Sequence, residues 1–183
     1  MDAFEQLVSD ALWSEGCWTQ TEVKVSLTKE EKALIGRTSA PRWELDVVAY
    51  VPLTNTLRVI ECKSYLDSTG VSATDLMDEG ARYASRYKLF TDATLRQVVL
   101  NRLGLQFTEL GACAAHPTVT LGMACGRFKT AGDRDRLREH FKIQGWELLD
   151  EEWLRAHLKQ LATGSYENKT SAVVAKLLLR RSA

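Results

Sequence analysis

Two neighbouring segments of the chain have the pattern of buried β-strands, yet both carry charged side chains. They span residues 43–50 and 57–63, are rich in aliphatic and β-branched residues, and are separated by a turn at 52–55. Asp46 interrupts the first segment, and Glu61 and Lys63 end the second. Side chains two residues apart on a strand face the same side, so Glu61 and Lys63 point together. A hairpin of the two strands would bring Asp46 beside them.

Charged groups at the end of a buried sheet need a partner or a metal ion. Two carboxylates beside one ammonium are the arrangement of a metal-dependent phosphodiesterase site. The competing interpretation is structural, because this short pattern occurs by chance in many chains of this length. Asp46 would then be a strand-end residue, and Glu61 with Lys63 an exposed pair on an edge strand. The strand, turn and second strand around the charges favour the functional interpretation.

Length and composition indicate one domain over residues 1–183, with 45% hydrophobic residues and no net charge. Zero net charge argues against a sequence-blind nucleic-acid coat protein. It leaves a nucleic-acid enzyme open, because basic residues gather in 81–104 and 127–142. The four cysteines lack metal-site or disulfide spacing and are expected to be reduced. With neither a signal-peptide pattern at the start nor a membrane-length apolar run, we expect a cytoplasmic protein and no membrane partner.

Hydrophobic periodicity predicts a helix, three strands, one or two helices, a strand, a helix, a short strand and closing helices. This order indicates an α/β fold with a mixed β-sheet flanked by helices. The expected strands are 17–27, 43–50, 57–63, 118–125 and 145–149, and the expected helices are 4–12, 73–89, 94–107, 133–144, one capped by Asp150, and 170–181. Ser72 and Asp75 are expected to form a capping box. Segment 28–40 is expected to be part helix and part loop, and 164–168 a loop.

Together these segments resemble the PD-(D/E)xK nuclease superfamily, and within it the Mrr-like restriction endonucleases. Residues 45–48 (Leu-Asp-Val-Val) are similar to the family's metal-binding aspartate strand, and residues 60–63 (Ile-Glu-Cys-Lys) match its (D/E)-x-K strand. The opening segment 4–8 resembles the family's first helix, whose glutamate often stands near the metal. The chain departs from the family in having Leu45 in place of proline, and Glu61 where the Mrr-like branch often has glutamine. The resemblance implies a restriction-endonuclease-like core.

The charge pattern and the resemblance together assign a role to each residue of the site. Asp46 and Glu61 would hold Mg²⁺, or Mn²⁺ in its place, because hard carboxylate oxygens suit these cations. The resemblance implies a further ligand in the backbone carbonyl of Cys62. Lys63 would position the attacking water or stabilise charge in the transition state. Glu5 would reach a second metal or a metal-bound water, and the competing interpretation is a solvated residue of the first helix.

Substrate contacts are expected on the helix that follows the site. There Arg82, Tyr83, Arg86 and Tyr87 would form two interleaved i, i+4 pairs able to meet phosphates and unstacked bases. A solvated, partly packed helix face is the alternative. The charges of 127–142 suggest i, i+4 pairing on a helix surface. His157 falls near the apolar face of its helix and is predicted to be a packed helix residue.

DNA is the expected substrate, and RNA is not excluded. Double-strand cutting by a chain with one site leads us to expect a homodimer. Target recognition could come from this domain's own loops or from a partner chain. The competing function is a catalytically silent nuclease-fold module for binding or assembly.

Overall fold

A five-stranded mixed sheet forms the centre of the protein. The computed structural model describes residues 2–36, 42–165 and 168–179. The strand order is β1-β2-β3-β4-β5, with an antiparallel meander of the first three strands and parallel pairing of the last two. The strands are β1 (Trp18–Val25), β2 (Trp43–Val51), β3 (Thr56–Lys63), β4 (Thr118–Cys125) and β5 (Glu147–Leu149). The predicted α/β class with a mixed sheet is confirmed.

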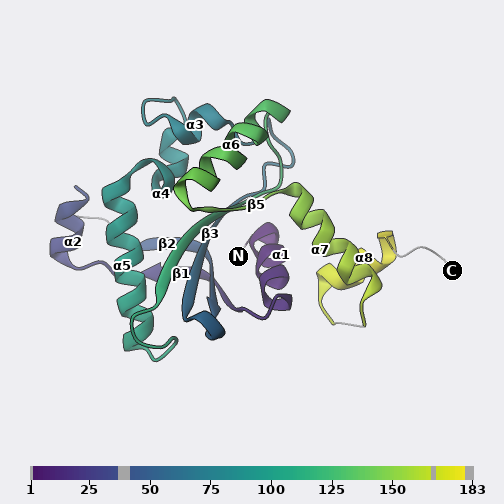
Figure 1. The fold of residues 1–183 in the computed structure, drawn as a ribbon, viewed down its shortest axis with the longest axis horizontal. Coiled ribbons are helices and arrows are strands. Elements are labelled where there is room, and N and C mark those ends of the chain that lie inside the picture. Colours follow the sequence, from purple (N-terminus) through teal and green to yellow (C-terminus); the bar gives the residue numbers. More distant parts are fainter. Residues whose placement is uncertain (1, 37–41, 166–167, 180–183) are drawn as a thin grey trace.

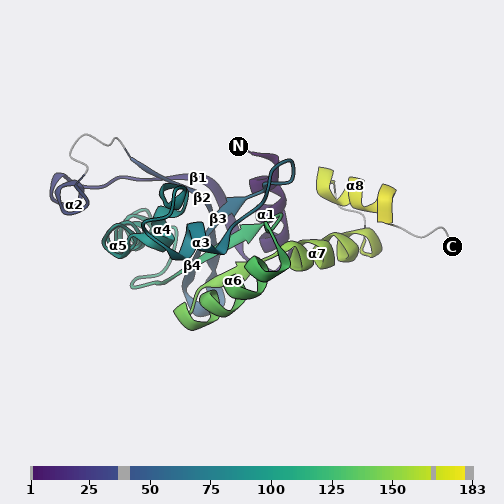
Figure 2. The ribbon, with the colours of Figure 1, turned by 90° about the horizontal axis from the view of Figure 1, so that it is seen from above.

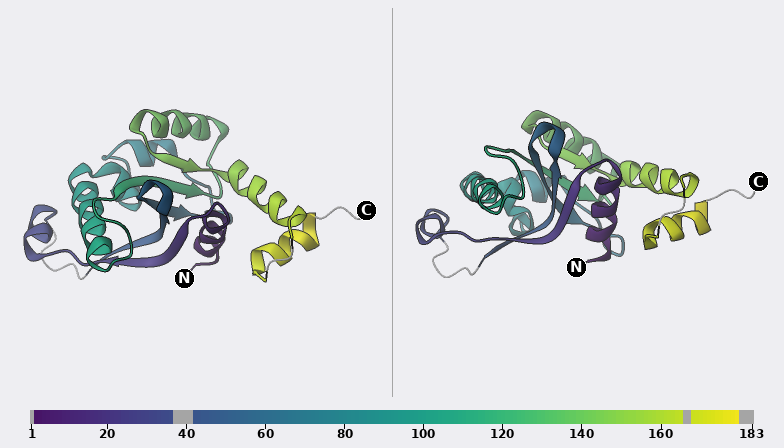
Figure 3. Two further views of the ribbon diagram at one scale, coloured as in Figure 1. Left: turned by 60° about the horizontal axis from the view of Figure 1, so that its bottom comes forward. Right: turned by 90° about the horizontal axis from the view of Figure 1, so that it is seen from below.

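Helices cover both faces of this sheet (Figures 1 and 2). Helices α3 to α6 lie over one face and α1 over the other, while α7 and α8 project from the body (Figure 3). Among the described residues, no helix is both long and apolar enough to cross a membrane. The helical elements are α1 (Ala3–Ser14), α2 (Lys29–Leu34), η1 (Pro52–Thr54), α3 (Ala73–Met77), η2 (Ala84–Tyr87), α4 (Lys88–Thr91), α5 (Ala93–Glu109), α6 (Ala131–Gln144), α7 (Glu151–Thr163) and α8 (Thr170–Leu179).

Successive side chains of β3 enter two different apolar layers. Val59 packs with the residues of α3 to α6, and the next residue, Ile60, packs with those of α1 and the start of α7. Both side chains are completely buried. A fully buried aliphatic side chain contributes about 1.5–3 kcal/mol through the hydrophobic effect. The middle of β3 is therefore sealed on both sides, and its carboxyl-terminal end carries the charged groups.

The predicted helix 73–89 is wrong as a single element, because the chain forms α3, η2 and α4 instead. Asp78 ends α3, and its side chain accepts a hydrogen bond from the backbone N–H of Gly80 at 2.9 Å. Such a local bond competes with helix continuation, and glycine disfavours helix further. The expected capping box also fails. Ser72 makes no side-chain cap, and the Ala73 N–H donates to Asp133 of α6 at 2.8 Å.

The other expected elements form with small shifts at their ends. Helices α5 and α6 begin earlier than expected, because Asp92 and Thr130 cap them with their side chains. Strand β5 is shorter than the strand expected over 145–149. Gly145 does not belong to it, because this residue caps the end of α6 with left-handed backbone (φ 67°). Residues 37–40 of the polar segment, 166–167 of the expected loop, and 180–181 of the last expected helix lie outside the described residues.

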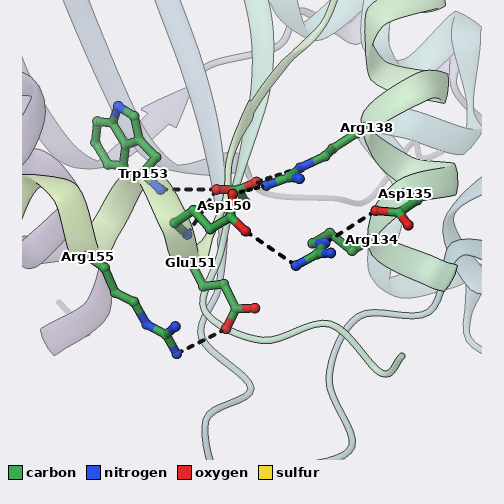
Figure 4. Close-up of polar contacts among 8 residues, drawn as sticks. Arg134, Asp135, Arg138, Asp150, Glu151, Trp153 and Arg155 are labelled. Carbon is green, nitrogen blue, oxygen red and sulfur yellow. Dashed lines mark hydrogen bonds and ion pairs between the residues drawn. The ribbon is translucent and has the colours of Figure 1, made fainter. Parts of the chain in front are cut away.

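Ion pairs join α6 to the first turn of α7 (Figure 4). Asp150 caps α7, accepting hydrogen bonds from the backbone N–H groups of Glu152 and Trp153 at 3.0 and 3.1 Å. Arg138 donates through Nε to Asp150 at 2.8 Å and through Nη2 to Glu152 at 2.7 Å, and Arg134 reaches Glu152 at 3.4 Å. These two arginines therefore pair with acids at the start of α7, and Arg134 also pairs with the adjacent Asp135 at 3.3 Å, so the i, i+4 pairing expected for them within α6 is wrong.

Candidate active site

The candidate site lies where β3 separates from β2 but remains paired with β4. The β2–β3 register ends at Val47 and Ile60, whereas the β3–β4 register continues to Lys63 and Cys125. Beyond Ile60, the Cys62 N–H donates to Oδ2 of Asp46 at 2.6 Å. The carboxylate thus replaces a backbone carbonyl in the ladder. This hydrogen bond satisfies a partly buried donor and fixes the orientation of Asp46.

Lys63 connects the two carboxylates that the sequence placed together. Its Nζ lies 3.6 Å from Oε2 of Glu61 and 3.8 Å from Oδ2 of Asp46. The side chains of Lys63, Glu61 and Asp46 are 17%, 15% and 24% exposed. They are largely buried but reachable from solvent. The expected convergence of the three residues is therefore found, and an exposed pair on an edge strand is not, because β3 is an inner strand.

Negative charge predominates in this group. Burial, and then the nearby Asp46 carboxylate, raise the pKa of Glu61 to about 7, and Lys63 only partly offsets the increase. Burial acts to lower the pKa of Lys63, but Glu61 and Asp46 overcome it and raise that pKa, so Lys63 remains an ammonium. Burial also raises the pKa of the Cys62 thiol, which therefore remains protonated.

Glu5 approaches the site from the first turn of α1. Burial and the charge of Asp46 raise the pKa of Glu5, although the Asp2 N–H opposes them by donating to its carboxylate at 3.4 Å. The same bond belongs to a capping box, in which the Asp2 side chain accepts from the Glu5 backbone N–H, and Asp2 also accepts from the Phe4 N–H at 2.7 Å. Glu5 is half-buried. It thus combines a structural role in α1 with a third carboxylate near the charged group.

Asp46 and Glu61 offer the oxygen donors that a hard divalent cation binds, and water and substrate would have to supply its other ligands. In the described parts of the chain, no three or more His, Cys, Asp or Glu side chains are grouped so that they could hold a metal ion by themselves. Magnesium ordinarily uses only one or two carboxylates, with waters and substrate phosphates as its other ligands. Asp46 and Glu61 supply two such carboxylates, and one ammonium does not balance their charge and that of Glu5.

The predicted substrate-binding residues lie on η2 and the turn before it, not on one long helix. The guanidinium carbons of Arg82 and Arg86 lie 5.2 and 4.6 Å from the ring centroid of Tyr83. Tyr87 is only 3% exposed and belongs to the core. The two interleaved i, i+4 pairs are therefore wrong, because Tyr83 packs against both arginines. His157 is buried and stacks on Trp153, which confirms it as a packed helix residue.

Sequence reasoning missed Tyr65, which follows Lys63 by two residues. Its backbone has a φ of 44°, in the left-handed region that residues other than glycine seldom adopt. Its side chain packs against the core layer that contains Tyr87, and its interaction with Tyr87 raises the pKa of that phenol. Strained backbone of this kind is concentrated at functional sites. The only signal in the sequence was its spacing from Lys63.

Fold and site together define an α/β protein whose two adjacent strands bring two carboxylates and an ammonium together at one end of the sheet. No family model matches the chain, and neither a curated protein nor a solved structure matches it. The functional interpretation therefore rests on the geometry and chemistry of the site.

Proposed function

We propose that the protein is a metal-dependent phosphodiester hydrolase that acts on DNA as an endonuclease. The observation that carries this proposal is the contact of Lys63 Nζ with both Asp46 and Glu61 at the end of a buried strand. Buried charges are costly, and the hydrogen bond from the Cys62 N–H gives a structural reason for Asp46 but none for Glu61. A site that takes a cation and an anionic phosphate accounts for their presence.

The fold supports the proposal through the order of its elements. A first helix carries Glu5, the aspartate strand follows, and the strand with Glu61 and Lys63 comes next. Helices and the parallel strands β4 and β5 complete the sheet. This is the order expected for a restriction-endonuclease-like core, and we propose that residues 1–183 form one such domain of the PD-(D/E)xK superfamily.

Each residue of the site has a defined task in this proposal. Asp46, held by the Cys62 N–H, and Glu61 would bind Mg²⁺ or Mn²⁺, with the Cys62 carbonyl as a further ligand. The bound cation would neutralise the phosphate and make a water molecule more acidic. Lys63 would orient the attacking water and stabilise the negative charge that develops on the phosphoryl oxygens. Glu5 would orient a water from the side of α1.

The decisive experiment compares DNA cleavage by the wild-type protein and by Lys63→Met. Supercoiled plasmid is incubated with Mg²⁺, with Mn²⁺ or with EDTA. We expect metal-dependent nicking or cutting that falls about 100-fold or more in Lys63→Met, because preorganised charge stabilisation contributes on that order. Lys142→Met is the control, since Lys142 is exposed and on α6. Undiminished cleavage by folded Lys63→Met would overturn the assignment.

The same preparations test the cofactor, the substrate and the competing function. Calorimetric titration with Mg²⁺ or Mn²⁺ should show binding that Asp46→Asn weakens. Single-stranded DNA and RNA in the cleavage assay determine which nucleic acid is preferred. Sedimentation with duplex DNA tests the homodimer that double-strand cutting would require. A folded protein that neither binds these cations nor cuts would be the catalytically silent binding module.

A further inference from the structure

Two arginines and a tyrosine form an exposed cluster at η2, which we call the Arg82–Tyr83–Arg86 cluster. Both guanidinium groups lie against the same aromatic ring, at 5.2 and 4.6 Å from its centroid, and 39% of Tyr83 remains exposed. Cation–π attraction at these distances restrains two otherwise flexible side chains. The two positive groups are thereby held close together on the surface.

Neither guanidinium has a carboxylate partner in the described parts of the chain. Among the described residues, no Asp or Glu lies within ion-pair distance of Arg82 or Arg86. Glu79 lines a cavity beside Ala84 and Ser85 but remains outside that distance. Other arginines of the chain do pair with acids, as Figure 4 shows for α6 and α7. These are Arg58, Arg102, Arg134, Arg138 and Arg155.

The buried side of η2 connects the cluster to the candidate active site. Ala84 and Tyr87 are buried there, and Tyr87 belongs to the core layer that contains α3 to α6. Burial, and then the interaction with Tyr65, raise the pKa of Tyr87, so the Tyr87 phenol remains protonated. Tyr65 lies two residues beyond Lys63 and packs against the same core layer as Tyr87. The cluster is thus positioned through packed contacts with the segment that carries Lys63.

We propose that the Arg82–Tyr83–Arg86 cluster clamps the DNA substrate by its phosphate backbone. The inference rests on the proposed function and adds to it how the substrate is positioned. Guanidinium groups bind phosphate through paired N–H donors. Because neither arginine pairs with an acid among the described residues, the cluster offers two guanidinium groups to phosphate oxygens.

The test measures DNA binding as a function of salt. Labelled duplex DNA is titrated in Ca²⁺ with wild-type protein, with Arg82→Ala/Arg86→Ala, and with the control Arg155→Ala/Lys159→Ala on α7. One lost phosphate contact lowers the slope of log K against log salt by about 0.9. We expect that change, with affinity about tenfold weaker at 0.1 M salt, for the η2 variant alone. Matching thermal midpoints verify that the fold is intact.

The outcomes separate this inference from the proposed function. If wild-type protein cuts and binds DNA while the η2 variant keeps the full salt slope, the clamp is wrong and the nuclease stands. If wild-type protein neither binds nor cuts, the proposed function fails and the clamp with it. A Tyr83→Leu variant whose loss of affinity is independent of salt and confined to single-stranded DNA would indicate base stacking, and would also overturn the clamp.

Discussion

Replacing Glu61 with glutamine should stabilise the metal-free protein, and increasingly so as the pH rises. Glu61 has its folded pKa raised from 4.5 to about 7, by burial and then by Asp46. A carboxyl group with a raised folded pKa contributes stability that is complete below the unfolded value and lost as pH rises through the folded value. A shift from 4.5 to about 7 corresponds to a loss of about 3 kcal/mol in the free energy of unfolding. Glutamine has no charge to bury and avoids this loss.

Urea denaturation in EDTA between pH 5 and pH 8 measures this difference. The free energy of unfolding of Glu61→Gln minus that of wild type should grow with pH, toward an upper limit of about 3 kcal/mol, at equal m-values. Titrating groups that do not interact with Glu61 occur in both proteins and cancel. Glu139→Gln is the control, because Glu139 is exposed on α6 and should give a flat difference. A constant or decreasing difference for Glu61→Gln would refute the reasoning.

Two further predictions concern the scaffold. Asp150→Ala should lower the free energy of unfolding by about 2 kcal/mol in chemical denaturation, because it removes the α7 cap and the partner of Arg138. Asp150→Asn should lower the free energy of unfolding by less, since asparagine can still cap α7. Equal losses in the two variants would show that the cap contributes nothing. Burial acts to raise the pKa of Glu31, but hydrogen bonds from Arg102 and Thr28 outweigh it and lower that pKa. Glu31→Gln should therefore lower the free energy of unfolding at pH 7, and this loss should vanish as the pH falls through the lowered pKa of Glu31. A loss that persists in acid would show that the charge of Glu31 is not its cause.

The convergence of the three charged residues could be predicted because it depends on two neighbouring strands and the short turn between them. Strand alternation placed Glu61 and Lys63 on one side, and a short turn brought Asp46 beside them. The separation of β2 from β3 after Ile60 was not predictable, because it depends on how far each neighbouring strand remains paired. The same holds for the left-handed backbone of Tyr65, which the amino-acid type does not favour.

The predicted helix at 73–89 failed for a different reason. Its apolar spacing suited one helix, but the Asp78 side chain bonds to the Gly80 N–H and turns the chain. Tyr87 then docks into the core from η2 and not from a continuous helix face. Hydrophobic periodicity cannot detect a short polar turn that is stabilised by tertiary packing. The arrangement of Arg82 and Arg86 on Tyr83 was therefore hidden as well.

The sheet topology also determines when the site takes shape during folding. Asp46, Glu61 and Lys63 all lie in the β2–β3 hairpin, which closes a short loop, whereas β4 reaches β3 only after the long crossover through α3, α4 and α5. Short loops close at lower entropic cost and tend to form first. The three charges therefore meet while they are still solvated. We expect the electrostatic cost of burying them to arise later, as β4 and the helices complete the sheet and its two apolar layers.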